Sequence, residues 1–191
     1  MPNNAKILAF AGSLRAGSFN KTLLRTAVGA AEAEGAAVTT VDLADYRMPI
    51  YDGDFEAENG LPESAQKLKA LFMEHNGLLI AAPEYNGSIT AVLKNTIDWV
   101  SRQDGSADLS CYAGKTAGLI AVGGGMGGMR GLVHVRQILT NIGVLVIPAQ
   151  ATVSGAWSAF EDNGALKDEG HKTLVEKVGA SLAQTLGKLS A

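Results

Sequence analysis

The sequence alternates between short apolar runs and longer segments with helical spacing. Five runs rich in apolar and β-branched residues predict strands, at residues 5–11, 36–43, 77–82, 116–122 and 144–147. Two of them have almost no polar alternation, as expected for strands buried on both faces of a parallel sheet. Each run is followed by a segment whose apolar residues recur every three or four positions, which predicts a helix.

The five helical segments each carry one apolar stripe. The stripes are Leu23, Leu24, Ala27, Val28 and Ala31; Leu68, Leu71 and Phe72; Leu93, Ile97 and Val100; Val135, Ile138, Leu139 and Ile142; and Leu174, Val178, Leu182 and Leu186. Strand–helix alternation requires right-handed crossovers that cover both faces of a parallel sheet. We therefore predict a flavodoxin-like, three-layer α/β/α fold with five parallel strands in the order 2-1-3-4-5.

The length of 191 residues suits one hydrophobic core, so we expect a single domain over residues 1–191. Within it, the polar and acidic stretch at residues 51–60 predicts a surface loop. Ligands bind sheets of this kind at the carboxyl ends of the strands, near strands 1 and 3. The informative loops are therefore those that follow the first, third and fourth strands.

Composition and charge exclude several classes of function. The formal net charge of −3 offers no basic field, so we expect no nucleic-acid partner. No apolar stretch approaches the roughly 20 residues that span a bilayer, and no cleavage-like signal is evident, so we expect a cytoplasmic protein without a membrane partner. Cys111 is the single cysteine and the three histidines show no ligand spacing, so we expect no metal. Redox chemistry would require a bound cofactor.

The loop after the first strand, residues 12–20, reads GSLRAGSFN. A helix begins directly after it, and a helix N-terminus offers unpaired N–H groups and the positive end of a dipole. Ser13, Ser18 and Asn20 add short polar side chains, and Arg15 adds a fork of donors. The loop predicts a cradle for a phosphate monoester. The alternative is that Ser18 or Asn20 only caps the helix and Arg15 is solvated.

The loop after the third strand, residues 83–88, reads PEYNGS. Its Asn-Gly pair is also typical of an ordinary tight turn, a reading compatible with ligand binding. The next helix carries Lys94 and Asp98 four residues apart, where an ion pair is worth only about 0.2–0.5 kcal/mol. Trp99 is expected in the core or in a subunit contact. We assign no chemistry to these three side chains.

The loop after the fourth strand, residues 123–130, contains a formal G-x-G-x-x-G. A dinucleotide fingerprint also needs an acidic residue about 20 positions later, and the next strand, expected to end in residues 147–150, supplies none. The loop is therefore either a ligand contact or only a flexible connection.

Together, the motifs G-S-x-R-x-x-S-x-N, P-E-Y-N-G-S and K-N-x-I-D-W resemble the NADPH-dependent FMN reductase family, which includes quinone and chromate reductases. The resemblance spans nearly the whole chain. It implies a phosphate site at the first loop and flavin contacts at the other two. The implied FMN-binding residues are Ser13, Arg15, Ser18 and Asn20 for the phosphate, and Pro83, Glu84, Tyr85, Asn86, Gly87, Gly123 and Gly124 for the ring system.

The resemblance also implies an oxidoreductase that passes hydride from NAD(P)H through FMN to a small-molecule acceptor, namely a quinone, chromate, an azo compound or free flavin. Because the flavin carries such chemistry, we predict no catalytic side chain. It further implies a homodimer or homotetramer with the flavin near a subunit boundary, bordered by residues 48–51. Two alternatives remain: a flavodoxin-type electron carrier and a flavin-free interaction module.

Overall fold

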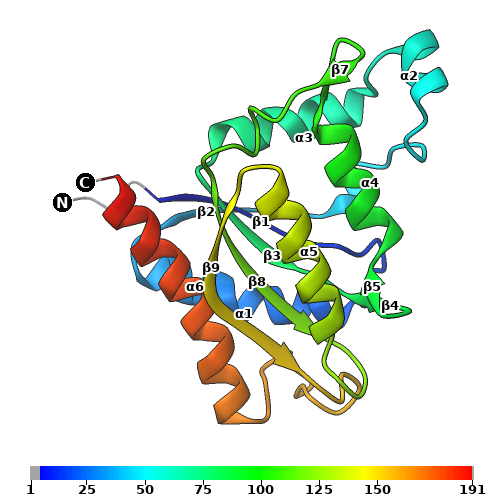
Figure 1. Ribbon diagram of the computed structural model, residues 1–191. Coiled ribbons are helices and arrows are strands. Elements are labelled where there is room, and N and C mark those ends of the chain that lie inside the picture. The colour runs from blue at the N-terminus through cyan, green and yellow to red at the C-terminus, as the bar shows by residue number, and fades with distance from the viewer. Residues whose placement is uncertain (1–4, 191) are drawn as a thin grey trace.

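The structure, a computed structural model, describes residues 5–190. At its centre lies a parallel sheet of five strands in the order β2-β1-β3-β8-β9 (Figure 1). The strands are β1 (Lys6–Ala11), β2 (Ala37–Val41), β3 (Gly77–Ala81), β8 (Thr116–Val122) and β9 (Leu145–Val153). Ile7 of β1 pairs with Val38 on one side and Gly77 on the other. The predicted order 2-1-3-4-5 is confirmed.

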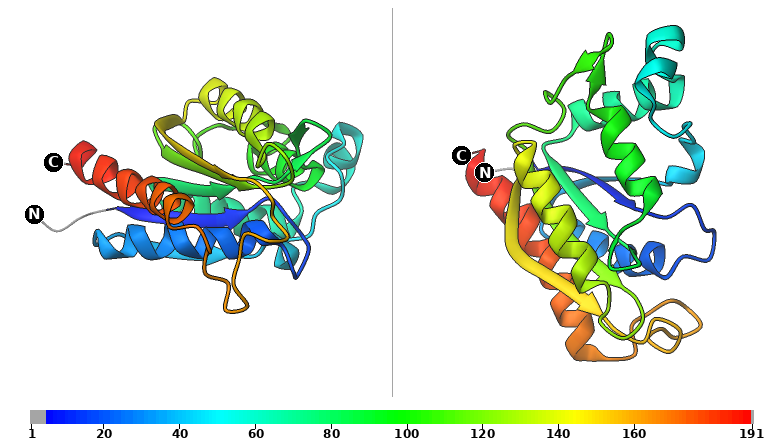
Figure 2. Two further views of the ribbon diagram at one scale, coloured as in Figure 1. Left: turned by 90° about the horizontal axis from the view of Figure 1, so that it is seen from below. Right: turned by 45° about the vertical axis from the view of Figure 1, so that its right-hand side comes forward.

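Helices cover both faces of the sheet, as Figure 2 shows in its left view. The helices are α1 (Phe19–Ala33), α2 (Gly53–Asn59), α3 (Glu63–Glu74), α4 (Ala91–Val100), α5 (Met129–Asn141) and α6 (Glu169–Leu189), with a 3-10 turn η1 (Leu43–Asp45). Side chains of α1 and α6 form one buried apolar cluster with the sheet, and those of α3, α4 and α5 form the other. The predicted three-layer α/β/α fold class is confirmed.

The stretch at residues 51–60 is not a loop throughout, because it contains α2. The Asp52 carboxylate accepts hydrogen bonds from the N–H groups of Asp54 and Phe55 and so caps the helix. Glu56 is the one buried residue of α2. A helix with a single buried position carries no apolar stripe, which is why the periodicity did not predict it.

The fifth strand is longer than its apolar run, since β9 continues through Pro148 to Val153. Its pairing with β8 shifts in register between Ala117 and Leu119. Proline lacks an N–H, and an edge strand with an irregularity tolerates this. The expected strand end at residues 147–150 was therefore wrong, and the loop that follows starts later in the chain.

Several smaller features complete the chain. Two hairpins pair β4 (Glu84–Tyr85) with β5 (Ser88–Ile89) and β6 (Arg102–Gln103) with β7 (Ser106–Ala107).

One residue of the apolar stripe expected in the last helix lies elsewhere. In α6, Leu174 is exposed, and Val175 faces the core in its place. Within residues 5–190, the helices include none that combines the length and the apolar character needed to span a membrane.

The helix after β5 behaves as its sequence predicts. Lys94 and Asp98 form an ion pair with an N···O distance of 2.7 Å. Trp99 is fully buried and donates its indole N–H to the Pro49 carbonyl at 2.8 Å. Tyr51 packs edge-on against the same indole, with 5.0 Å between ring centroids. This contact fixes the segment before α2 against α4.

Candidate functional site

The loops after β1, β3 and β8 meet at one edge of the sheet, at the lower right of Figure 1. The Gly12 N–H donates to the carbonyl of Ala81, the last residue of β3, at 2.9 Å. The Thr90 hydroxyl, which caps α4, donates to the Gly12 carbonyl at 2.7 Å. These hydrogen bonds join the first loop, which follows β1, to the second loop, which follows β3. Ligands bind at this edge of a parallel sheet, where the strands end.

The first loop offers donors that the protein itself does not use. Ser18 is the N-cap residue of α1, but its hydroxyl makes no capping hydrogen bond. Among the described residues, no acceptor is found for the backbone N–H groups of residues 17–20. The Arg15 side chain is exposed and has no hydrogen bond or ion pair within residues 5–190. Unpaired N–H groups, a hydroxyl and a guanidinium at a helix N-terminus fit a phosphate group.

Two other predicted phosphate residues are already engaged. The Asn20 side chain donates to the Val122 carbonyl at 2.8 Å and accepts from the Val122 N–H at 3.0 Å. It therefore ties the first loop to the end of β8. The Ser13 hydroxyl accepts the Arg15 N–H at 3.3 Å and shapes the turn between them.

The second loop forms the β4–β5 hairpin. Asn86 and Gly87 both have positive φ, 52° and 80°, as a type I′ turn requires. The Glu84 carboxylate lies 2.6 Å from the Arg130 guanidinium and also accepts the Gly131 N–H at 3.2 Å. The start of α5 therefore holds the first strand of the hairpin in place.

The second strand of the hairpin has its own contact with α5. The Ser88 hydroxyl lies 2.9 Å from Nδ1 of His134. Sequence reasoning missed His134 and Arg130 because their partners are 46 residues away along the chain. The one available signal was that Arg130 is the last residue of the glycine-rich stretch at residues 123–130.

The contacts of Glu84 with Arg130 and Gly131 determine the pKa of its carboxyl group. Burial raises the pKa of the Glu84 carboxyl, but hydrogen bonds from the Gly131 N–H and from Arg130 together outweigh burial. The net result is a pKa below the ordinary value of 4.5. Glu84 is therefore ionised at neutral pH and paired with a guanidinium, so it is no proton donor there.

The third loop is held by packing, not left as a flexible connection. Gly127 has a φ of 63°, and a Cβ there would lie 2.9 Å from the Val153 carbonyl carbon. Gly128 has a φ of 91°, and its Cβ would lie 2.8 Å from the Ala121 Cβ. Only glycine fits both the backbone conformation and the space. The Gly123 N–H also donates to the Val153 carbonyl at 3.0 Å.

A cleft of about 380 Å³ lies between the second and third loops. Its lining residues are Glu84, Asn86, Gly87, Gly123, Gly124, Gly125, Met126, Gly128 and Arg130. Five predicted ring-contact residues are thus brought together. Pro83 is buried and Tyr85 is exposed, and neither lines this cleft. The predicted phosphate residues lie outside it, on the adjoining first loop.

A fourth segment, residues 154–167 between β9 and α6, borders the same edge. The N–H groups of Gly155 and Ala156 donate to the carbonyls of Gly124 and Gly123 at 3.1 and 3.0 Å. Further along, the Phe160 ring stacks on Phe19 at the start of α1, with 5.9 Å between centroids. We call residues 154–167 the β9–α6 segment. It connects the third loop to the end of the first loop, and sequence reasoning did not single it out.

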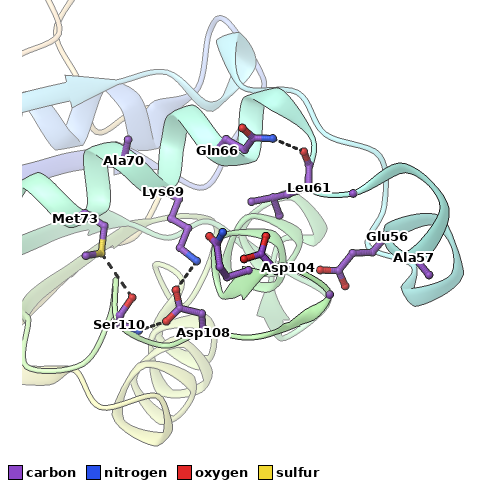
Figure 3. Close-up of a pocket in the computed structure, with 13 residues that line it drawn as sticks. Glu56, Ala57, Leu61, Gln66, Lys69, Ala70, Met73, Asp104, Asp108 and Ser110 are labelled. Carbon is purple, nitrogen blue, oxygen red and sulfur yellow. Dashed lines mark hydrogen bonds and ion pairs between the residues drawn. The ribbon is translucent and has the colours of Figure 1, made fainter.

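A larger cavity, with a volume of about 770 Å³, lies elsewhere, along α2, α3 and the β6–β7 hairpin (Figure 3). None of its lining residues comes from the three loops. Its buried charges are paired, since the Lys69 ammonium lies 2.7 Å from Asp108 and Arg102 lies 2.8 Å from Glu56. Paired charges of this kind indicate a structural role for the walls of this cavity.

Within residues 5–190, no group of three or more His, Cys, Asp or Glu side chains is placed to hold a metal. His75 is buried, and its ring nitrogens contact the Leu71 carbonyl and the Thr39 hydroxyl. Cys111 is a buried free thiol, and burial raises its pKa to about 11. Both side chains serve packing, and the Cys111 thiol is no nucleophile at neutral pH.

The sheet order and the site at its carboxyl edge define a flavodoxin-like α/β protein. The model of the NADPH-dependent FMN reductase family matches residues 5–158. The chain belongs to this family, as predicted. The prediction of an oxidoreductase that uses FMN, with NAD(P)H as co-substrate, is confirmed at the level of the family.

Individual proteins agree with this assignment. The chain is similar to a probable NADPH:quinone oxidoreductase of Oryza sativa subsp. japonica, with 35% identity over 72% of this chain and 65% of that protein's length. It is also similar to an NAD(P)H-dependent FMN reductase of Pseudomonas aeruginosa, with 32% identity over 93% of this chain and 92% of that one. The NAD(P)H:(acceptor) oxidoreductase FerB of Paracoccus denitrificans shares the fold, with a TM-score of 0.78, 24% identity and coverage of 96% and 98%.

Proposed function

We propose that this protein binds FMN at the carboxyl edge of its sheet and uses NAD(P)H to reduce a quinone. The observation that carries the proposal is a set of unused donors next to a cleft built from the β4–β5 hairpin and the glycine-rich loop. These donors are the Arg15 guanidinium, the Ser18 hydroxyl and the N–H groups of residues 17–20. When bound, FMN supplies the two-electron redox chemistry.

The residues of the chain bind and orient the cofactor in this proposal. The N–H groups of residues 17–20, the Ser18 hydroxyl and Arg15 hold the phosphate. Asn20 and Ser13 act by positioning, because their side chains fix the loop to Val122 and to the Arg15 N–H. Since no side chain of the cleft is a poised nucleophile or base, the protein contributes geometry and electrostatics.

The cleft residues hold the ring system. Both walls contain glycines, Gly87 in the hairpin and Gly123, Gly124 and Gly125 in the glycine-rich loop, and the lack of a side chain there lets the backbone come close to a ring. Pro83 is buried, and Tyr85 is exposed next to the turn at Asn86 and Gly87. In this proposal, Tyr85 forms part of the entrance through which the nicotinamide and the acceptor reach the ring.

A quinone is proposed as the acceptor because it is the acceptor named for the rice relative. A flat, uncharged molecule also suits a cleft in which the exposed Arg130 is already paired with Glu84. Chromate, azo compounds and free flavin are the competing acceptors. Steady-state kcat/KM values for one representative of each class discriminate them, and a quinone should give the highest value.

The test of the function is a visible spectrum of the FMN-loaded protein under anaerobic conditions. Addition of NADH or NADPH should bleach the flavin absorbance, and subsequent addition of a quinone should restore it. FMN that binds but stays oxidised under excess of both nicotinamides would contradict the proposal and favour a flavodoxin-type carrier. A colourless protein that ignores added FMN would instead favour an interaction module.

We further propose a homo-oligomer, either a dimer or a tetramer, in the cytoplasm. Three apolar side chains are exposed, Met126 in the cleft and Met129 and Val133 in the first part of α5, and a second copy of the chain would cover them. Light scattering after size exclusion should give at least twice the mass of one chain, and Val133→Asp should lower that mass. Fractionation of cells tests the compartment.

A further inference from the structure

The two tryptophans of the chain lie in opposite environments. Trp99 is fully buried and hydrogen-bonded to the Pro49 carbonyl. Trp157, in the β9–α6 segment, is 77% exposed. Among the described residues, its indole has no hydrogen-bond partner and no aromatic partner.

The backbone around Trp157 is nevertheless fixed. The Ser158 N–H donates to the Gly155 carbonyl at 2.9 Å, and Gly155 has a φ of 63°, which closes a tight turn. Ala156 is buried in the core, and its N–H donates to the Gly123 carbonyl at 3.0 Å. The turn therefore holds the base of the indole in a defined place while the ring itself is left in water.

That place is the edge of the cleft. A Cβ on Gly124 would lie 3.5 Å from atom Cη2 of the Trp157 ring, an ordinary van der Waals distance. Gly124 itself lines the cleft. At the far end of the same segment, Phe160 stacks on Phe19 directly after Ser18. The indole thus lies beside the glycine-rich wall of the cleft, on a segment whose further residues reach the start of α1.

We propose that Trp157 is a cofactor-contact residue whose indole packs against the isoalloxazine of FMN from the side of the glycine-rich loop. This inference rests on the proposed function. Its immediate neighbours in the turn, Ala156 and Ser158, are uncharged, which suits a flat ring better than a phosphate. An electron-rich indole and an electron-poor isoalloxazine attract each other, and contact would remove exposed apolar surface from water.

The first test is an FMN titration of the wild-type apoprotein and three variants. Trp157→Ala should raise the Kd for FMN about tenfold, the usual effect of removing one aromatic ring from a stacked contact. Trp157→Phe should stay close to wild type, because a flat ring remains. Leu145→Ala, which removes an exposed apolar side chain at the opposite end of β9, is the matched control and should change nothing.

The second test is the fluorescence of bound FMN. An indole in contact with an excited flavin quenches it by electron transfer, whereas a phenyl ring does not. Bound FMN should therefore be brighter in Trp157→Phe than in the wild type, although its affinity is retained. A merely structural role for Trp157 would leave this brightness unchanged.

The outcomes separate the two proposals. If the wild type fails to bind FMN, the proposed function and this inference both fail. If the wild type binds FMN but Trp157→Ala has a Kd within about twofold of it, the inference alone is overturned. A Trp157→Ala variant that keeps its FMN affinity but loses oligomeric mass would show the indole to be a subunit contact, which also overturns the inference. Melting curves of the apoproteins check that each variant folds.

Discussion

At the scale of single residues, the site is a set of donors that the protein leaves unpaired. Arg15 is exposed on a loop whose neighbouring N–H groups have no acceptor within residues 5–190. A phosphate dianion would satisfy all of them at once through charge-assisted hydrogen bonds. Removing Arg15 should therefore affect cofactor binding and leave folding intact, because the exposed side chain makes no hydrogen bond or ion pair within residues 5–190.

We predict that Arg15→Ala raises the Kd for FMN about tenfold or more, since a hydrogen bond to a charged group contributes about 1.5–3 kcal/mol. The melting temperature of the apoprotein should not change. Arg25→Ala, which removes an exposed arginine from the next turn of α1, is the control and should keep the wild-type Kd. Equal affinities of the wild type, Arg15→Ala and Arg25→Ala for FMN would mean that the phosphate binds elsewhere.

Glu84 makes a second prediction at this scale. Its pKa lies below 4.5 in the folded protein, so its pairing with Arg130 is fully present above pH 4.5 and is lost as the pH falls through the lowered value. Glu84→Gln should raise the Kd for FMN about two- to fivefold at pH 7, as expected when a partly exposed ion pair is lost.

The matched control for Glu84 is Glu63→Gln, which breaks an exposed ion pair with Lys67 on α3. Isothermal titration of both variants with FMN is the measurement. An unchanged affinity in Glu84→Gln would mean that the hairpin keeps its position without Arg130.

The candidate site could be predicted only in part from the sequence. Residues of the three loops were found because their motifs are continuous in the chain. Arg130 and His134 were not, because each contacts a hairpin residue 46 positions away, and such contacts exist only after the sheet has formed. Trp157 was missed for a similar reason, since its position next to Gly124 depends on how far β9 extends.

At the scale of elements, the close approach of α1 and α6 makes a prediction about stability. A Cβ on Gly179 of α6 would overlap the Ala27 carbonyl of α1. Gly179→Ala should therefore force the helices apart and lower the free energy of unfolding by about 1–3 kcal/mol. Gly29→Ala on α1, where a Cβ meets no atom within 4 Å, should instead raise it by about 0.5–1 kcal/mol.

Urea denaturation of the two glycine variants provides these free energies. Because both substitutions replace a helical glycine with alanine, intrinsic helix propensity favours both equally. A stabilised Gly179→Ala variant would show that the two helices do not pack as closely as the structure describes.

The Lys69–Asp108 pair connects α3 to the segment after the β6–β7 hairpin. The hydrogen bond from Lys69, with those from Ser110, lowers the pKa of Asp108 from 3.8 to about 2. A lowered pKa stabilises the folded state above pH 3.8, and this stabilisation is lost as the pH falls towards 2. Asp108→Asn should therefore melt at a lower temperature at pH 7, with a difference from wild type that shrinks below pH 3.8. A constant difference across this range of pH would contradict the ion pair.

The elements themselves were largely predictable, because strands buried on both faces read as continuous apolar runs. This holds for β1, β3 and β8, whereas the partly exposed edge strands β2 and β9 were found from their apolar and β-branched residues. The strand order followed from the alternation of strands with helices. The exceptions have physical reasons: α2 exposes all but one residue, Pro148 interrupts the apparent end of β9, and two-residue strands such as those of the β6–β7 hairpin leave no periodicity.

At the scale of the whole molecule, we propose that the chain is one domain, because a single sheet organises both apolar clusters. Unfolding should then be cooperative. Far-ultraviolet circular dichroism, which follows the helices, and the emission of buried Trp99 should give the same midpoint in urea. Two separated transitions would argue for two independently folding parts.

The same architecture explains why the site lies where it does. Parallel strands bring three loops that are far apart in the sequence to one edge, and the helix that follows each strand presents its N-terminus there. The β9–α6 segment then links the outer loops on the same side. The site is thus a property of the sheet topology, and the loop residues adapt it to a phosphate and a flat ring.

The central claim is that the first loop holds the phosphate of FMN while the cleft beside it holds the ring. A crystal structure of the protein with bound FMN tests this most directly. The phosphate should lie within hydrogen-bond distance of the N–H groups of residues 17–20 and of Arg15, with the ring between residues 84–87 and 123–126. Density for FMN elsewhere on the protein, with the first loop empty, would contradict the account.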